Sequence, residues 1–234
     1  MSRGIHALTS YTWSHCLDFG STYTAFPSRR GNCDFDVRHN FQAGLSWDLP
    51  GVRENKFAKA ILNRWGLDGR LMARSAFPIT LQGPQIVDPS TGQINSAGVN
   101  LVPGQPIYVY GPQYPGSRKI NSAAFQPPPG CTFTSCPIPA EGNAPRNFVR
   151  GFGAWQVNIA ARRDFPLYER LKLQFRAEAF NVLNHANFGF IDPALTNATF
   201  GQALKMLNQS LSTVASQYQQ GGPRSMQFAL KLIF

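Results

Sequence analysis

The sequence has few charges, few cysteines and no long apolar run. Charged residues make up 15% of its 234 residues, and four residues are cysteine. Aromatic residues make up 12%, which excludes a disordered chain, and the sparse cysteines exclude a disulfide-stapled miniprotein. No stretch approaches the roughly 18 apolar residues of a membrane-spanning helix. The 21 glycines and 18 prolines argue against an all-helical bundle, because they would interrupt helices throughout.

Two further absences concern charge clustering and export. The 22 basic and 12 acidic residues give a net charge of +10, but the basic residues are spread along the chain. A diffuse positive charge is typical of a solvated surface, so we expect no nucleic-acid partner. Residues 1–10 lack the apolar segment of a secretory signal. The chain is therefore expected either not to be exported or to lack its true N-terminus.

Alternation of apolar and polar residues predicts six long strands. The pattern is clearest at 37–48, where Phe41, Ala43, Leu45 and Trp47 share one face. The other predicted strands cover residues 5–14, 65–74, 155–164, 171–178 and 226–234. Strands of about ten residues exceed the mean of about 5–6 in soluble proteins. They match the length that crosses a bilayer as a tilted barrel strand.

The predicted connections alternate between short and long. Residues 165–170 are the shortest connection and are predicted to form a hairpin turn, whereas 75–154 form a long loop. Antiparallel membrane barrels have short periplasmic turns and longer external loops. The predicted fold class is therefore all-β, an antiparallel transmembrane β-barrel segment of about six long strands. Because the smallest single-chain barrels have eight strands, we expect an open partial barrel.

The two faces of the predicted strands differ in chemistry. Many charges on one face would be costly in a dry core, so we expect that face to line a water-filled lumen and the apolar face to contact lipid. The predicted lumen-facing residues are Arg38, Arg70, Arg74, Arg162, Lys172, Arg176, Glu178 and Lys231. All four tryptophans lie on the apolar face at predicted strand ends, which predicts an aromatic girdle formed by Trp13, Trp47, Trp65 and Trp155. The alternatives are tryptophans packed in a core and an ordinary solvated sheet face.

Residue patterns for chemistry are few. The four histidines lack metal-ligand spacing, and neither a catalytic triad nor a phosphate loop is readable. We therefore expect no enzyme activity, cofactor or metal. Cys131 and Cys136 lie in a predicted external loop, where oxidising conditions favour a disulfide. Cys16 and Cys33 flank the first external loop and could pair across its base. Free thiols are the alternative.

Several segments resemble the C-terminal barrel of a TonB-dependent outer-membrane receptor of the Oar-like type. They are 10–14 (SYTWS) with Asp18, 34–41 (DFDVRHNF) with 47–50 (WDLP), and 143–147 (NAPRN) with Arg150 and Gly151. The most specific is 173–189 (LQFRAEAFNVLNHANFG), followed by 221–234 (GGPRSMQFALKLIF). The terminal Phe234 is similar to the aromatic signal that the barrel assembly machinery reads. The likeness spans almost the whole chain in order.

The resemblance implies an outer-membrane location and a transport function. Residues 1–234 are expected to be the C-terminal part of a receptor barrel, a fragment without a signal peptide, a carboxypeptidase-regulatory-like domain or a plug. Its partners would be outer-membrane lipid, the barrel assembly machinery and an unknown ligand, with the TonB complex contacting only the missing N-terminal parts. The alternative is a secreted β-sandwich binding module, such as a carbohydrate binder, which predicts shorter strands and exposed aromatics at loop tips.

Overall fold

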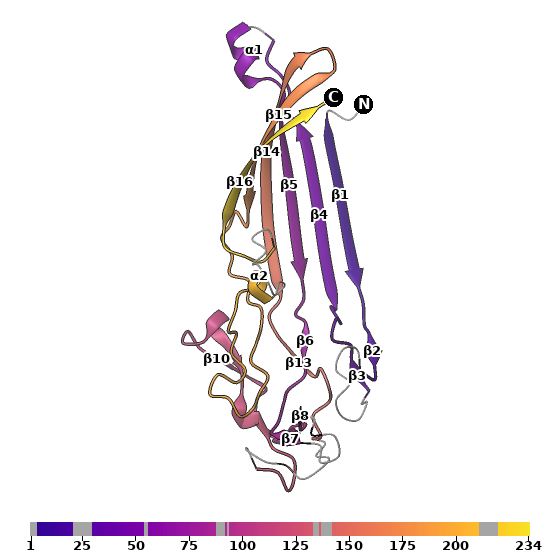
Figure 1. Ribbon diagram of the computed structural model, residues 1–234, viewed down its shortest axis with the longest axis vertical. Coiled ribbons are helices and arrows are strands. Elements are labelled where there is room, and N and C mark those ends of the chain that lie inside the picture. Colours follow the sequence, from indigo (N-terminus) through magenta and orange to yellow (C-terminus); the bar gives the residue numbers. More distant parts are fainter. Residues whose placement is uncertain are drawn as a thin grey trace.

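A computed structural model describes residues 4–20, 30–53, 56–87, 92, 94–132, 136, 142–210 and 220–234. One antiparallel sheet dominates it (Figure 1). Its strands are β1 (Ile5–Trp13), β4 (His39–Asp48), β5 (Trp65–Arg74), β14 (Ala154–Tyr168), β15 (Leu171–Phe180) and β16 (Ser225–Ile233). They pair in the order β1-β4-β5-β14-β15-β16. All six predicted strands are confirmed, and the fold is all-β and antiparallel.

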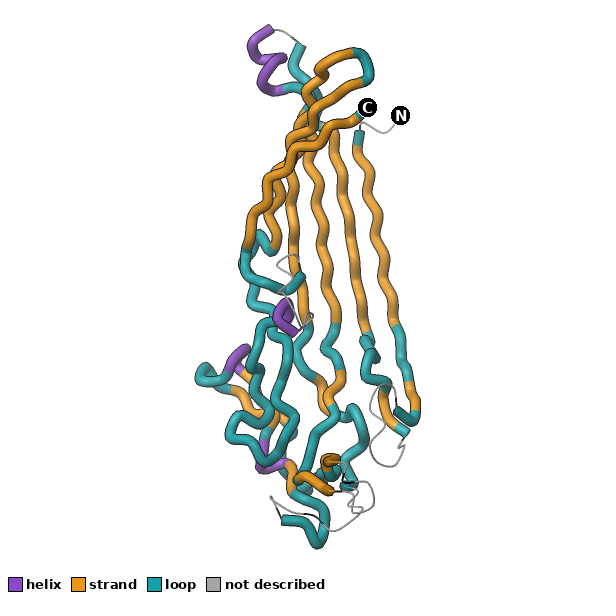
Figure 2. Tube along the Cα trace, in the orientation of Figure 1, coloured by secondary structure: helices purple, strands orange, loops and turns teal. Residues whose placement is uncertain are grey.

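The remaining elements are short and lie in the connections (Figure 2). The strands are β2 (Leu17–Asp18), β3 (Gly31–Asn32), β6 (Pro78–Ile79), β7 (Gln85–Val87), β8 (Ile94–Ser96), β9 (Asn100–Leu101), β10 (Tyr108–Tyr110), β11 (Arg118–Ile120), β12 (Phe125–Gln126) and β13 (Val149–Arg150). The helices are α1 (Lys56–Leu62), η1 (Pro115–Ser117), η2 (Ser122–Ala124) and α2 (Leu207–Ser210). None of the described helices has the length and apolar character needed to cross a membrane.

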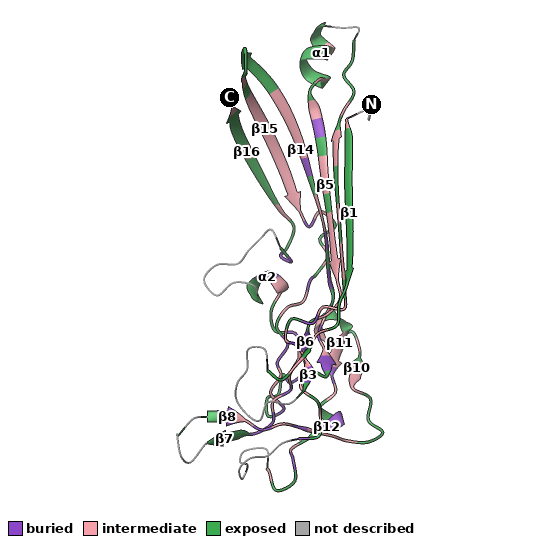
Figure 3. Ribbon diagram, turned by 90° about the vertical axis from the view of Figure 1, so that its right-hand side faces the viewer, coloured by how far each residue is buried: buried purple, intermediate pink, exposed green. Residues whose placement is uncertain are grey.

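The sheet curls but does not close. Strands β1 and β16 each have one neighbour in the sheet among the described residues. Figure 3 shows β15 and β16 standing apart from β1 across the inner side of the curve. This arrangement agrees with the expected open partial barrel. It also disfavours the β-sandwich alternative, because the described residues form no second sheet packed against this one.

The connections sort to opposite ends of the sheet. The connections 14–38, 75–153 and 181–224 gather at one end, which we call the long-loop end (lower in Figure 1). The connections 49–64 and 169–170 lie at the other, the short-turn end, together with Gly4 and Phe234, the first and last described residues. The hairpin turn is tighter than predicted, because β14 continues through Pro166 to Tyr168. A register shift between Pro166 and Tyr168 accommodates the proline, which cannot donate a ladder hydrogen bond.

Buried apolar side chains concentrate in the long loops instead of the sheet. The hydrophobic cluster consists of Leu81, Val99, Ile120, Ala124, Phe125, Val149, Ile191, Leu195, Phe200 and Ala203. All ten belong to the connections 75–153 and 181–224, so these two loops pack into one unit (Figure 3). The strands are mostly exposed or half-buried, as expected of a single layer with neither face covered by a second sheet.

Candidate functional site

The strand register separates two chemically different sheet faces. One face carries Phe41, Trp47, Leu67, Trp155 and Phe228, and the other carries Asp68, Arg70, Arg162, Arg176 and Glu178. We call these the apolar face and the charged face. Helix α2 and Gly221 lie on the charged side, where Gly221 N donates to Gln156 Oε1 at 2.7 Å. Figure 3 places α2 on the inner side of the curve, so the charged face is concave.

An ion-pair network crosses the concave face. Arg162 pairs with Asp48 and with Asp68 (3.4 Å), and Arg176 pairs with Asp68 (2.7 Å) and Glu178 (2.6 Å). The network joins β4, β5, β14 and β15, and the Arg162–Asp48 pair reaches across β5. Because the acidic groups are paired, the sheet holds its charges without the full cost of unpaired burial.

A glycine on β5 leaves space for the Arg162 side chain to extend across the strand to Asp48. Gly66 of β5 lies between Asp48 and Arg162 in the register. A Cβ at Gly66 would lie 2.5 Å from Arg162 Cζ. The guanidinium therefore occupies the space that a larger side chain would fill, and a substitution at Gly66 would have to displace it.

Of the predicted lumen-facing residues, Arg162, Arg176 and Glu178 belong to the network, and the other five lie outside it. Arg38 precedes β4 and pairs with Asp36 at 3.0 Å, so it belongs to the long loops and its predicted place on the sheet face is corrected. Arg74 is the last residue of β5, and its guanidinium lies 4.2 Å from the Phe77 ring centroid and donates to Ser75 O. The register places Arg70, Lys172 and Lys231 on the charged face with the network residues.

The four tryptophans lie on the apolar face in two pairs. Trp13 and Trp155 lie towards the long-loop end, and Trp47 and Trp65 lie towards the short-turn end. Trp155 and Arg163, the register partner of Trp65, are eight residues apart on β14. At about 3.3 Å per residue that spacing is about 26 Å along the strand, which matches the apolar band of about 25 Å in outer-membrane barrels.

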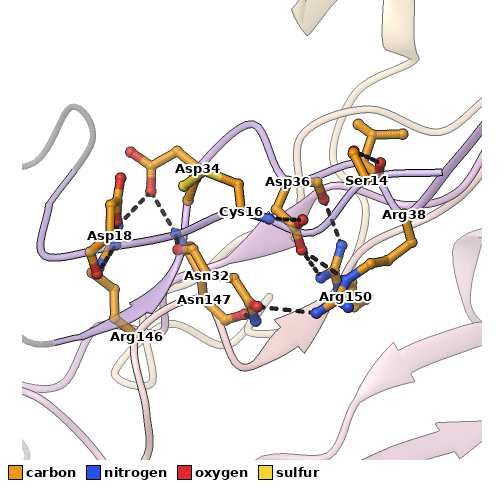
Figure 4. The surroundings of a disulfide bond; sticks show 12 residues. Ser14, Cys16, Asp18, Asn32, Asp34, Asp36, Arg38, Arg146, Asn147 and Arg150 are labelled. Carbon is orange, nitrogen blue, oxygen red and sulfur yellow. Dashed lines mark hydrogen bonds and ion pairs between the residues drawn. A yellow bond between two sulfur atoms is a disulfide. The ribbon is translucent and has the colours of Figure 1, made fainter. Parts of the chain in front are cut away.

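An inter-loop clamp at the long-loop end joins segments that are far apart in sequence (Figure 4). We define it as Asp18, Asn32, Asp34, Asp36, Arg38, Arg146, Asn147 and Arg150. Arg146 pairs with Asp18 and with Asp34 (3.1 Å), and Arg150 pairs with Asp36. These contacts fix the first long loop to the end of the second. The sequence segments singled out by resemblance, 34–41 and 143–151, are the ones that meet here.

Asp36 lies at the centre of the clamp and is 1% exposed. It accepts hydrogen bonds from Cys16 N (2.9 Å), Arg38 Nε (3.0 Å) and Arg150 Nη2. Burial opposes ionisation of Asp36, but the hydrogen bonds from Cys16 N and Arg150, with the charges of Arg150 and Arg38, hold its pKa below the usual range. The Asp36 carboxylate is therefore ionised and buried, and it holds Cys16, Arg38 and Arg150 together.

Asn147 completes the clamp in a conformation that favours asparagine. Its φ is 55°, a left-handed value that asparagine tolerates better than most residues. Its Nδ2 donates to Asn32 O (2.7 Å) and Asp34 Oδ1 (2.6 Å), and its Oδ1 accepts from Thr80 Oγ1 (2.7 Å). One buried amide thus links the connections 14–38 and 75–153.

Disulfides lie in the same loops. The structure joins Cys16 to Cys33 beside the clamp and Cys131 to Cys136 within the second long loop. Sequence reasoning left Asp18, Asp34, Asp36, Arg146, Asn147 and Arg150 without a role. The only available signal was their membership in segments that resemble a family. Phe234 follows the end of β16 and is 91% exposed.

Removing the Cys16–Cys33 disulfide is expected to loosen the first long loop. The bond closes a loop with a sequence separation of 17, for which chain entropy predicts a loss of about 3 kcal/mol. The Cys16→Ser/Cys33→Ser variant should be cleaved by protease in the 14–38 connection much faster than the wild type. The Cys131→Ser/Cys136→Ser variant is the control, because that bond closes a separation of five and should leave the 14–38 connection protected. Equal cleavage of all three proteins would contradict the prediction.

The geometry is thus that of a barrel wall: a curved single sheet with a concave charged face, an apolar convex face and loops gathered at one end. A family model for an outer membrane beta barrel domain matches residues 1–227. The chain belongs to this outer membrane beta barrel family. Neither the curated proteins nor the solved structures contain a match to the chain.

Proposed function

We propose that the chain forms part of the barrel wall of a TonB-dependent receptor of the Oar-like type, which takes up a large ligand. The concave charged face lines the lumen and the convex apolar face contacts outer-membrane lipid, with Trp13, Trp47, Trp65 and Trp155 at its two interfaces. The β16 strand, ending before Phe234, is the segment recognised by the barrel assembly machinery. The long-loop end faces outward, because external loops are the longer ones in such barrels.

The observation that carries this proposal is the packed loop unit. The connections 75–153 and 181–224 share a hydrophobic cluster, and the clamp joins 14–38 to the end of 75–153. One disulfide lies within 14–38 and another within 75–153. Ordering a loop before binding lowers the conformational entropy lost on binding, so a rigid surface of this kind favours ligand recognition. The same loops open onto a charged concave face, as expected where a polar ligand passes inward.

Association with TonB tests the proposal. The full-length protein, tagged in an external loop, is solubilised from outer membranes and offered the purified periplasmic domain of TonB as the probe. We expect co-purification at a yield comparable to that of a known TonB-dependent receptor from the same membranes. Absence of TonB from the eluate, while the known receptor retains it, would overturn the receptor assignment and leave the barrel family intact.

A further inference from the structure

The connection 49–64 contains a helix at the short-turn end. The adjacent strands β14 and β15 are joined by the two residues 169–170, whereas β4 and β5 are joined through α1. Trp65 Nε1 donates to Ile61 O at 2.8 Å, and Arg163 Nη2 donates to Ala60 O. Both donors belong to the apolar face by register. The last turn of α1 is therefore attached to the convex side of the sheet (Figure 1).

The exposed surface of α1 is amphipathic. Phe57, Ile61 and Leu62 are 77%, 50% and 55% exposed, and α1 has no buried residue. At about 100° per residue these three side chains and Ala58 fall within one arc of about 140°. Lys56 and Lys59 fall on the opposite side. A short helix with an exposed apolar arc and lysines opposite it is typical of a segment that lies in a membrane interface.

The charge around α1 and its place at the edge of the apolar band indicate which kind of molecule binds its exposed surface. The connection 49–64 contains Arg53, Lys56, Lys59 and Arg64 against the single acidic residue Glu54. Arg163 extends the basic surface, with its guanidinium 5.4 Å from the Trp65 ring centroid and 4.6 Å from that of Phe165. This arrangement keeps a cation at the edge of the apolar band, where arginine and tryptophan anchor proteins to the headgroup layer.

We propose that α1 is an interfacial anchor that binds anionic phospholipid in the leaflet on the short-turn side. Phe57, Ile61 and Leu62 enter the acyl boundary, and Lys56 and Lys59 contact headgroup phosphates. The last turn of α1 is hydrogen-bonded to Trp65 and Arg163 of the apolar face, at the edge of the lipid-facing band, which favours lipid over a protein partner. The inference rests on membership in the outer-membrane barrel family and is independent of the receptor assignment.

Lipid photo-crosslinking tests the proposal. The protein is extracted from outer membranes and reconstituted in nanodiscs of phosphatidylcholine alone, or of phosphatidylcholine with phosphatidylglycerol, each containing a phospholipid with a diazirine in its acyl chain. Mass spectrometry then measures lipid adducts on peptides from 56–62. We expect adducts to increase with phosphatidylglycerol. The Lys56→Glu/Lys59→Glu variant should reduce them by about fivefold or more, because each lysine near an anionic surface contributes about a fivefold preference.

Two comparisons keep the result interpretable. Adducts on β16 peptides report insertion of the barrel and should be equal in all variants. The Lys119→Glu/Lys205→Glu variant makes the same charge change at the long-loop end and should leave the α1 adducts unchanged. Labelled β16 with unlabelled α1 would overturn the proposal, as would α1 adducts insensitive to phosphatidylglycerol and to the lysine substitutions. If α1 bound a periplasmic protein instead of lipid, β16 would be labelled and α1 would not.

Discussion

Replacing Ala43 with arginine is expected to reduce assembly of the barrel in the outer membrane severely. Ala43 lies on the apolar face of β4, four residues from both Trp47 and His39, the register partner of Trp13. At about 3.3 Å per residue it is about 13 Å from each interface, at the middle of the apolar band. An arginine facing lipid at that depth costs about 2–4 kcal/mol.

The adjacent glycine provides a matched control. Gly44 lies on the charged face, and a Cβ added there would meet no atom within 4 Å. Gly44→Arg should therefore leave assembly close to wild type, although both variants place the same side chain on the same strand. The measurement is the amount of heat-modifiable, folded protein in outer membranes. Equal yields for Ala43→Arg and Gly44→Arg would contradict the assignment of the convex face to lipid.

Asp36→Ala is expected to release the inter-loop clamp. The substitution leaves Arg38 and Arg150 facing each other without the carboxylate that both contact. Breaking a buried ion pair by removing one partner costs about 3–5 kcal/mol, and the lower end applies because both guanidiniums reach water. Amide hydrogen exchange should become faster in 30–38 and 146–151 while exchange in β14 and β15 stays slow. Unchanged protection of those loop segments would show that the clamp is not what holds them.

The clamp should also respond to acid. Because the pKa of folded Asp36 is lowered, its contribution to loop stability is complete above the unfolded pKa of about 3.9 and is lost as the pH falls towards the folded value. Loop protection should therefore decline below about pH 4. Asp36→Asn should abolish most of this decline, since it removes the titrating group. An equally steep decline in Asp36→Asn would assign the acid sensitivity to other groups.

The strands were predictable because their signal is local. Alternation along residues 39–48 or 171–180 follows from the two different environments on either side of a sheet, so the period alone fixes the faces. The same alternation predicted the sheet face on which Arg162 lies and the opposite face on which Trp155 lies. Arg38 was misplaced for a related reason: it continues the alternation of β4, but it precedes the strand and its guanidinium pairs with Asp36.

The clamp and the packed unit of the connections 75–153 and 181–224 were not predictable, because their contacts join distant residues without periodicity. Nothing in the spacing of Asp36 and Arg150, 114 residues apart, indicates that they meet. The same holds for Val99 and Ile191, which belong to one cluster but to different connections. The extent of β14 was underestimated because Pro166 is a strand breaker in most contexts, and only the register shift beside it permits the strand to continue.

The position of the hydrophobic cluster determines where denaturants act. Its ten residues lie in the connections at the long-loop end, outside the six strands of the large sheet. Urea weakens the burial of apolar side chains in water, so it should act on this cluster. The strands are held by ladder hydrogen bonds, which become very costly to break in a hydrocarbon medium. The two parts of the chain are therefore stabilised in different solvents, and we expect urea to unfold the loops at concentrations that leave the six-stranded sheet folded in the membrane.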